Sequence, residues 1–111
     1  MVVPYQVSRE VGRVTSAEVW VAKDDGSELV RAGAIAAVSR DYTGSVTVRL
    51  SGGEQSAVTL VTVVSHEGKH TPADLHRQLI RAVAEQADAA EPAVIHPVWD
   101  EQGWTWATEP L

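Results

Sequence analysis

The sequence predicts an α+β fold: a small, mostly antiparallel β-sheet, one long amphipathic helix over residues 72–90 packed on it, and a C-terminal β-hairpin. Three observations lead to this prediction. Apolar and polar side chains alternate over residues 46–51, which is the period of a half-buried strand. A strong helix-start signal at residues 71–74 is followed by an apolar stripe at helical spacing. Two apolar runs between residues 94 and 108 flank the turn sequence Asp-Glu-Gln-Gly.

The first half of the chain is predicted to form strands joined by turns. β-Branched and aromatic residues over 19–22 favour a strand, which the polar turn at 24–27 ends. Residues 28–40 hold enough alanine for a helix, but Gly33 interrupts them. We therefore predict a strand with a kink near Arg31–Gly33, followed by another turn at 41–44.

The segment 57–65 is apolar on both of its faces if it is a strand. Val58, Leu60 and Val64 share one face, and Val61 and Val63 share the other. Strands of this kind are usually central in a sheet or covered on both sides. The pattern predicts a central or doubly covered strand, and a second subunit is one candidate for the cover.

The long helix has clear signals at both ends. Thr71 is expected as the N-cap, Pro72 as the first helical residue, and Asp74 as an acid facing the positive end of the helix dipole. The core-facing stripe is expected to consist of Leu75, Leu79, Ile80, Val83 and Ala87. Glu91-Pro92 should end the helix because proline cannot continue it.

Composition limits the classes of function. The 111 residues predict one soluble globular domain, 1–111, and the absence of cysteine excludes disulfides and thiolate ligands. The sequence contains neither a membrane-length apolar run nor a signal-peptide pattern at its start, so we expect a cytoplasmic protein that does not bind membranes. A net charge of −6 with scattered arginines makes nucleic acid an unfavoured partner. The abundance of alanine and valine points to a bacterium or its phage as the source.

One short motif is typical of metal chemistry. His66-Glu67-Gly68-Lys69-His70 resembles the H-E-x-x-H signature of the zincin metalloproteases. The resemblance covers five residues and implies His66 and His70 as zinc ligands and Glu67 as general base, with a third ligand from His76, Glu85 or His96.

The residues around this motif favour a loop instead. A predicted strand precedes the motif and a new helix follows it. Pro72 disfavours the helical conformation at Thr71, and in a continuous helix its ring would clash with the carbonyl of Gly68, four residues earlier. In a loop, a spacing of four residues does not fix two histidines on a common face. We therefore predict no metal site, no catalytic residues and no cofactor, and His76 is expected to be a partly buried helix residue.

The tryptophans are the second unusual feature. The chain has four tryptophans and no phenylalanine, and Trp99, Trp104 and Trp106 lie within eight positions. Trp104 and Trp106 should share one face of a strand, with Trp99 opposite Trp104 across the hairpin. They either fill a core of small side chains or anchor a partner, since tryptophan is enriched at binding hot spots.

These observations together predict a non-catalytic protein-binding or regulatory module that self-associates, with Trp99, Trp104 and Trp106 as the partner-binding residues. A zinc hydrolase using His66, Glu67 and His70 is the first alternative. A nucleic-acid-binding regulator is the second, and it would require a basic face that the sequence does not reveal.

Overall fold

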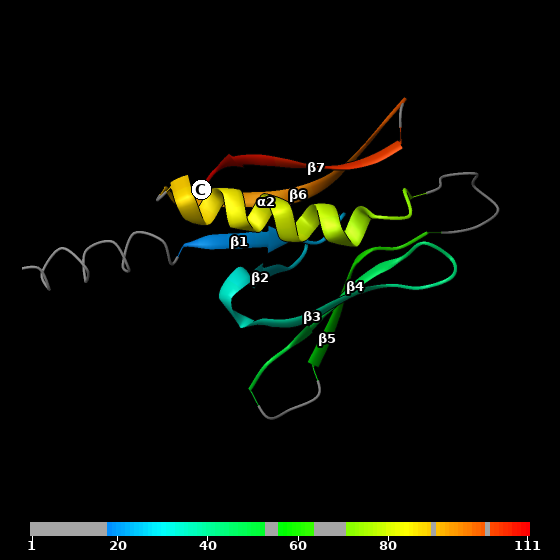
Figure 1. The fold of residues 1–111 in the computed structure, drawn as a ribbon, viewed down its shortest axis with the longest axis horizontal. Helices are drawn as coiled ribbons and strands as arrows, with labels where there is room; N and C mark the ends of the chain where they lie inside the picture. Colours follow the sequence, from blue (N-terminus) through cyan, green and yellow to red (C-terminus); the bar gives the residue numbers. More distant parts are fainter. Residues whose placement is uncertain (1–17, 53–55, 64–70, 90, 102) are drawn as a thin grey trace, which may run out of the picture.

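The computed structural model describes residues 18–52, 56–63, 71–89, 91–101 and 103–111 (Figure 1). Its described elements, in chain order, are β1 (Val19–Ala22), β2 (Leu29–Arg31), the 3-10 turn η1 (Ala32–Ala34), β3 (Ile35–Arg40), β4 (Val46–Leu50), β5 (Ser56–Val61), α2 (Leu75–Ala89), β6 (Ala93–Asp100) and β7 (Gly103–Pro110). The predicted α+β class is confirmed, including the long helix and the C-terminal hairpin. No helix in the described part of the chain has the length and apolar character needed to cross a membrane.

The strands divide into two sheets, where the sequence suggested one. The first sheet has the order β2-β1-β6-β7 and the second has the order β3-β4-β5. Neighbouring strands are antiparallel except β1 and β6, which are parallel. The turn η1 carries the chain from one sheet to the other. The interruption predicted near Arg31–Gly33 is present, but the single kinked strand is wrong: η1 separates two strands that belong to different sheets.

A single apolar core connects both sheets to the helix. The helix α2 lies against the four-stranded sheet and also contacts β3 of the smaller sheet (Figure 1). The buried members of the core are Val19, Val21, Val30, Val46, Val48, Val58, Leu60, Val61, Leu75, Leu79 and Ile95. Most of them are β-branched residues at alternate strand positions, as expected for sheets with one covered face.

The helix starts later than predicted. It begins at Leu75, and Thr71 is not its N-cap. The buried hydroxyl of Thr71 donates a hydrogen bond to the carbonyl oxygen of Gly44 (2.7 Å) and accepts one from Nε of Arg40 (3.1 Å). Thr71 therefore ties the approach to the helix to the β3–β4 turn, a long-range contact that no local pattern contains.

The predicted apolar stripe of α2 is also wrong at one position. Leu75 and Leu79 are buried as expected, but Ile80 is 56% exposed. Ile80 follows Leu79 directly, so it lies at the edge of the stripe, where the helix surface turns toward β3.

A bulge explains why β5 is apolar on both faces. Val46 pairs with Val61 and the next residue, Thr47, pairs with Thr59, so Leu60 has no partner of its own. Leu60 and Val61 are consequently both fully buried although they are neighbours. Of the two predicted arrangements, the central strand is wrong, because β5 forms one edge of its sheet. A covering second subunit is not needed to explain the pattern.

The turn at 41–44 is held by a carboxylate. The side chain of Asp41 accepts hydrogen bonds from the hydroxyl of Thr43 (2.6 Å) and from the backbone N–H groups of Thr43 and Ser45. The bond from the Thr43 hydroxyl is the main cause that lowers the pKa of Asp41. Gly44 follows with φ 98°, a conformation that side chains other than glycine rarely adopt.

Replacing Gly44 with alanine should destabilise the protein. The positive φ alone costs roughly 1–2 kcal/mol for a residue with a Cβ, and here the new Cβ would lie 2.5 Å from Oγ1 of Thr71. Gly26→Ala is the matched control, because Gly26 also has a positive φ, 76°, but a Cβ there would meet no atom within 4 Å. Thermal unfolding should show the larger loss for Gly44→Ala, and equal losses would mean that the Thr71 contact contributes nothing.

Candidate partner-binding surface

The C-terminal hairpin brings the three predicted tryptophans together. Trp99 lies opposite Trp104 and Pro97 lies opposite Trp106, while Asp100 and Gly103 form the last pair before the turn. The predicted cross-strand pairing is confirmed. The rings of Trp99 and Trp104 meet edge to face, with centroids 5.8 Å apart and planes inclined by 62°, an arrangement that aromatic pairs favour.

The three tryptophans differ in how deeply they are buried. Trp106 packs against the core and its Nε1 donates a hydrogen bond to the carbonyl oxygen of Leu75 (2.9 Å). Trp104 also packs against the core and is half-buried, and its Nε1 has no hydrogen-bond partner among the described residues. Trp99 is 41% exposed. Trp106 is therefore mainly a core residue, and Trp99 is the tryptophan that a partner can reach.

The position of the helix start accounts for this gradient. Trp106 bonds to Leu75, the first residue of α2, so Trp104 and Trp99 lie nearer the hairpin tip than the helix reaches. Figure 1 shows the tip of β6 and β7 rising away from the beginning of α2. Along β6 the residues of this face, Ala93, Ile95 and Pro97, are buried, and Trp99 is the first exposed one.

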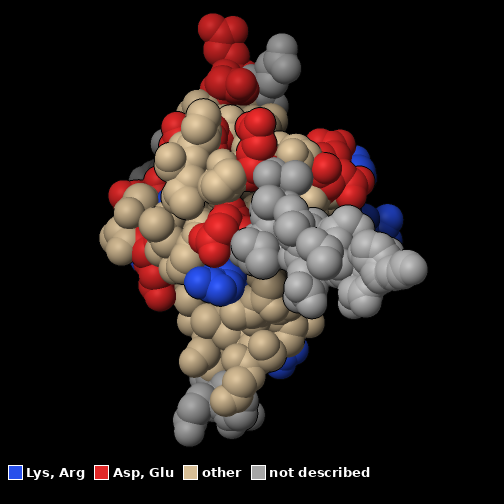
Figure 2. Space-filling view, turned by 90° about the vertical axis from the view of Figure 1, so that its left-hand side faces the viewer, with Lys and Arg blue, Asp and Glu red and all other residues tan. Residues whose placement is uncertain are grey.

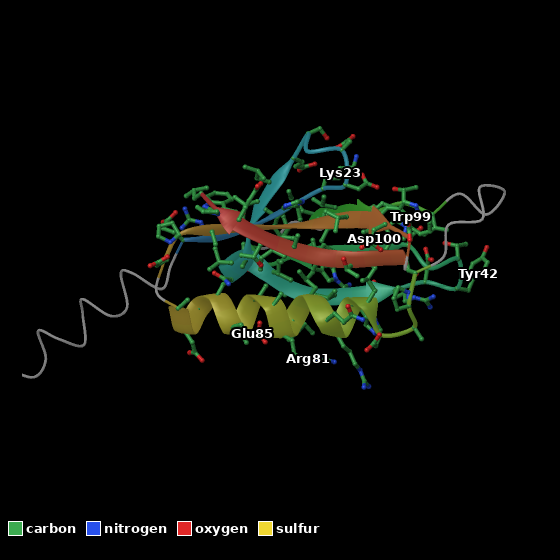
Figure 3. The ribbon with its side chains drawn as sticks, turned by 90° about the horizontal axis from the view of Figure 1, so that it is seen from above. Lys23, Tyr42, Arg81, Glu85, Trp99 and Asp100 are labelled. Carbon is green, nitrogen blue, oxygen red and sulfur yellow. The ribbon has the colours of Figure 1, made fainter. Side chains whose placement is uncertain are left out.

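The outer edge of β7 is a feature that no sequence pattern singled out. The N–H of Leu111 donates a hydrogen bond to the carbonyl oxygen of Pro92, so these two residues form a hydrogen-bonded pair. Hydrogen-bonded and non-bonded pairs alternate along an antiparallel ladder. With the observed register, the backbone groups of residues 104, 106, 108 and 110 therefore point away from β6. No other described element lies over this edge in Figure 3, which views it from above. The sequence offers only a weak signal, a strand without lysine or an interior proline.

We define the hairpin surface as the exposed part of Trp99, the half-buried Trp104 and the outer edge of β7. Its side chains are mostly apolar or small, and Glu109 is the only charged residue within β7. Such a surface can bind another protein through aromatic contacts and backbone hydrogen bonds.

The fourth tryptophan lies on the opposite face of the same sheet. Trp20 pairs with Val94, between core residues Val19 and Val21, so its side chain points away from α2. The guanidinium carbon of Arg31 lies 5.1 Å from the centre of the Trp20 ring, within the range of cation–π attraction. The indole also donates to Glu18 (3.3 Å). Trp20 is thus engaged by neighbours within the chain.

A shallow apolar groove of about 250 Å³ separates α2 from β3. It is lined by Ala32, Ile35, Ala36, Ala37, Val38, Leu79, Ile80 and Val83. None of these side chains titrates, so the groove cannot provide acid, base or nucleophilic catalysis. No residue of β6 or β7 lines this groove, so its exposed Ile80 provides a control position for the hairpin surface.

The candidate metal ligands are only partly described. His66, Glu67 and His70 lie outside the described residues, so the structure does not test their predicted loop. His76 lies in α2, half-buried, with no hydrogen-bond partner for Nδ1 among the described atoms.

The proposed third ligands do not come together. His96 alternates with the core residue Ile95 and so lies on the face of the sheet away from α2, where its Nε2 is 3.8 Å from the carboxylate of Glu109. Glu85 and His76 lie on α2, on the other side of the sheet. Within the described ranges, no three histidine, aspartate or glutamate side chains gather as a metal site would require.

Comparison with protein-family models, with curated proteins and with solved structures gives no match for this chain. The hairpin surface therefore has to be judged by its shape and chemistry.

Proposed function

We propose that this chain is a non-catalytic protein-binding module that self-associates through the hairpin surface. The observation that carries the proposal is the state of Trp99, a large aromatic residue that is 41% exposed yet held in place by its edge-to-face contact with Trp104. A single exposed apolar residue is common, but a tryptophan beside an uncovered strand edge is the kind of anchor that dominates binding energies.

Rigidity makes Trp99 suitable as an anchor. A side chain that is already ordered loses little conformational entropy when a partner covers it. Trp104 supports the ring of Trp99 from the neighbouring strand, and Trp106 fixes that strand to α2 through its bond to Leu75. The core tryptophan and the exposed tryptophan thus have connected roles: one positions the hairpin and the other offers the contact.

Charge favours a protein over a nucleic acid as the partner. Figure 2 shows one end of the molecule, and acidic side chains outnumber basic ones across it. The hairpin surface itself carries little charge, and the complete chain has a net charge of −6. Phosphate backbones are bound by clustered positive charge, so this distribution opposes them.

Replacing Trp99 with alanine should weaken self-association. We expect sedimentation equilibrium over a concentration series to show dimers for the full chain and a loss of about 2 kcal/mol or more of binding energy for Trp99→Ala, the size typical of a hot spot. The loss of the aromatic pair with Trp104 should cost the folded monomer about 0.5–1.5 kcal/mol.

Ile80→Ala is the control, because Ile80 is also exposed and apolar but lies in the groove between α2 and β3. It should leave association unchanged. A full chain that remains monomeric at every concentration, or equal effects of the two variants, would contradict the proposed function.

A further inference from the structure

The four edge strands of the two sheets are not equally protected against pairing. Edges are usually kept from pairing by short length, bulges, charges or proline. The edge strand β2 has only three residues, and β3 and β5 each take part in a register shift, with Arg40 at the end of β3. In contrast, β7 has eight residues and pairs with β6 without any shift. Among the described strands, β7 alone presents a long regular edge.

The free backbone groups of this edge form a regular row. Trp104, Trp106 and Thr108 each present an N–H and a carbonyl oxygen, and Pro110 presents a carbonyl oxygen only. Such a row matches the backbone of one further antiparallel strand. Thr105 and Ala107, which alternate with the tryptophans on the other face of β7, have small side chains and leave room for that strand.

We propose that β7 pairs with β7 of a second copy of this chain, antiparallel and about a two-fold axis at Ala107. The pairing would join the two four-stranded sheets into one continuous sheet. This inference rests on the proposed function and specifies which part of the hairpin surface makes the backbone contact. The edge of β7 pairs directly, and Trp99, one strand further in on β6, acts by supporting Trp104, which lies on the paired edge.

The register follows from the row of free groups. Ala107 is the midpoint between Trp104 and Pro110. A two-fold axis at Ala107 therefore sets the whole row of outward-pointing backbone groups of one β7 opposite the same row of the partner's β7. It places Trp106 opposite Thr108 of the partner subunit and Trp104 opposite Pro110 of the partner subunit. Every outward N–H then finds a carbonyl oxygen, and the proline falls at the end of the ladder, where its missing N–H costs least.

The charges near the edge also suit a second copy. Glu109, the only charge in β7, meets Thr105 of the partner subunit in this register and so faces no like charge. Arg81 and Glu85 line a hollow of α2 that also contacts Thr105 and Trp106. Figure 3 shows both on α2, level with the middle of β7.

A two-fold axis reverses the helix of the partner relative to α2. Because Arg81 and Glu85 have opposite charges and are one helical turn apart, reversal turns Arg81 toward Glu85 of the partner subunit. Within one chain Arg81 lies 3.9 Å from Asp74, and this exposed ion pair is weak enough for Arg81 to share its charge with a second carboxylate. An unrelated strand could use the same backbone groups, but it would not bring this matching pair of charges. This complementarity is the reason to prefer a second copy as the occupant.

Thr108→Pro tests the backbone pairing. Thr108 N–H points outward, so proline removes it without breaking the β6–β7 ladder, and an edge position tolerates proline. We expect the dimer dissociation constant from sedimentation equilibrium to rise at least tenfold, while the melting temperature of the dilute monomer stays unchanged. Thr108→Ala keeps the N–H and should dimerise like the unmodified chain.

Ala107→Cys tests the register, and the chain has no other cysteine to interfere. Residues on the axis form a non-bonded pair with Cα atoms about 4.5 Å apart, within the range that a disulfide spans. Under mild oxidation this variant should form a covalent dimer. Thr105→Cys, whose partner cysteine would lie four residues further along the ladder, should not.

The outcomes separate this inference from the proposed function. Dimers that survive Thr108→Pro but are lost in Trp99→Ala would overturn the β7 pairing and leave the proposed function standing. Dimers that fail to cross-link through Ala107→Cys would overturn the pairing about Ala107. A full chain that is monomeric at every concentration would overturn both the β7 pairing and the proposed function. If such a monomer binds a strand of another protein at the β7 edge, that strand and not a second copy is the occupant.

Discussion

Truncating Leu79 to alanine should lower the free energy of unfolding by about 2–5 kcal/mol. The residue is 1% exposed and belongs to the core that joins α2 to both sheets. Its removal takes away buried apolar area and leaves a cavity in a place where two sheets and a helix meet. Because small domains are stable by only about 5–15 kcal/mol, this is a large share of the total. Urea denaturation followed by circular dichroism would measure it.

Arg77→Ala is the matched control for Leu79→Ala. Arg77 lies in the same helix but on its exposed face, and surface substitutions usually change stability by less than about 0.5 kcal/mol. The two variants change helix propensity in a similar way, so the difference between them reports burial. Equal stabilities would mean that α2 does not present Leu79 to the core.

The elements that the sequence predicts well are those with local causes. The β-hairpin and the Trp99–Trp104 pair depend on a short turn and on alternation along two adjacent segments, and both are confirmed. The interruption near Arg31–Gly33 is also local, since Gly33 lies in it.

The errors have long-range causes. Thr71 has the residue type of an N-cap, but its hydroxyl bonds to Gly44, far away in the sequence. Leu60 and Val61 suggested a doubly covered strand because a bulge in the pairing of β4 and β5 cannot be read from one strand alone. The parallel pairing of β1 with β6 likewise joins segments from opposite ends of the described chain.

The candidate site shows the same division. The sequence could place Trp104 and Trp106 on one face, because that follows from strand periodicity. It could not say which tryptophan is exposed, because that depends on where α2 begins along the hairpin. The free edge of β7 depends on the strand order of the whole sheet, which no local pattern contains.

Replacing Trp106 with alanine should be among the most damaging substitutions in this chain, with an expected loss of about 3–5 kcal/mol. Two separate contributions would be lost. The indole packs against the core between β7 and α2, and its Nε1 donates a hydrogen bond to the carbonyl oxygen of Leu75 (2.9 Å). The second contribution is the smaller one, about 0.5–1.5 kcal/mol, because the carbonyl of Leu75, the first residue of α2, keeps its helical hydrogen bond when the indole donor is removed.

Trp106→Phe separates the two contributions, because phenylalanine keeps most of the apolar contact and removes only the N–H donor. We expect a loss of about 1–3 kcal/mol for this variant, from the lost hydrogen bond together with the smaller ring. Trp99→Ala serves as the exposed comparison, with a loss near 0.5–1.5 kcal/mol. Chemical denaturation should therefore rank Trp106→Ala as the least stable variant, then Trp106→Phe, then Trp99→Ala. At temperatures where all three variants are folded, Trp99→Ala should weaken dimerisation the most. If Trp106→Ala unfolds at the same urea concentration as Trp99→Ala, the hairpin is not fixed to α2 through Trp106, and the rigid presentation of Trp99 would lose its structural basis.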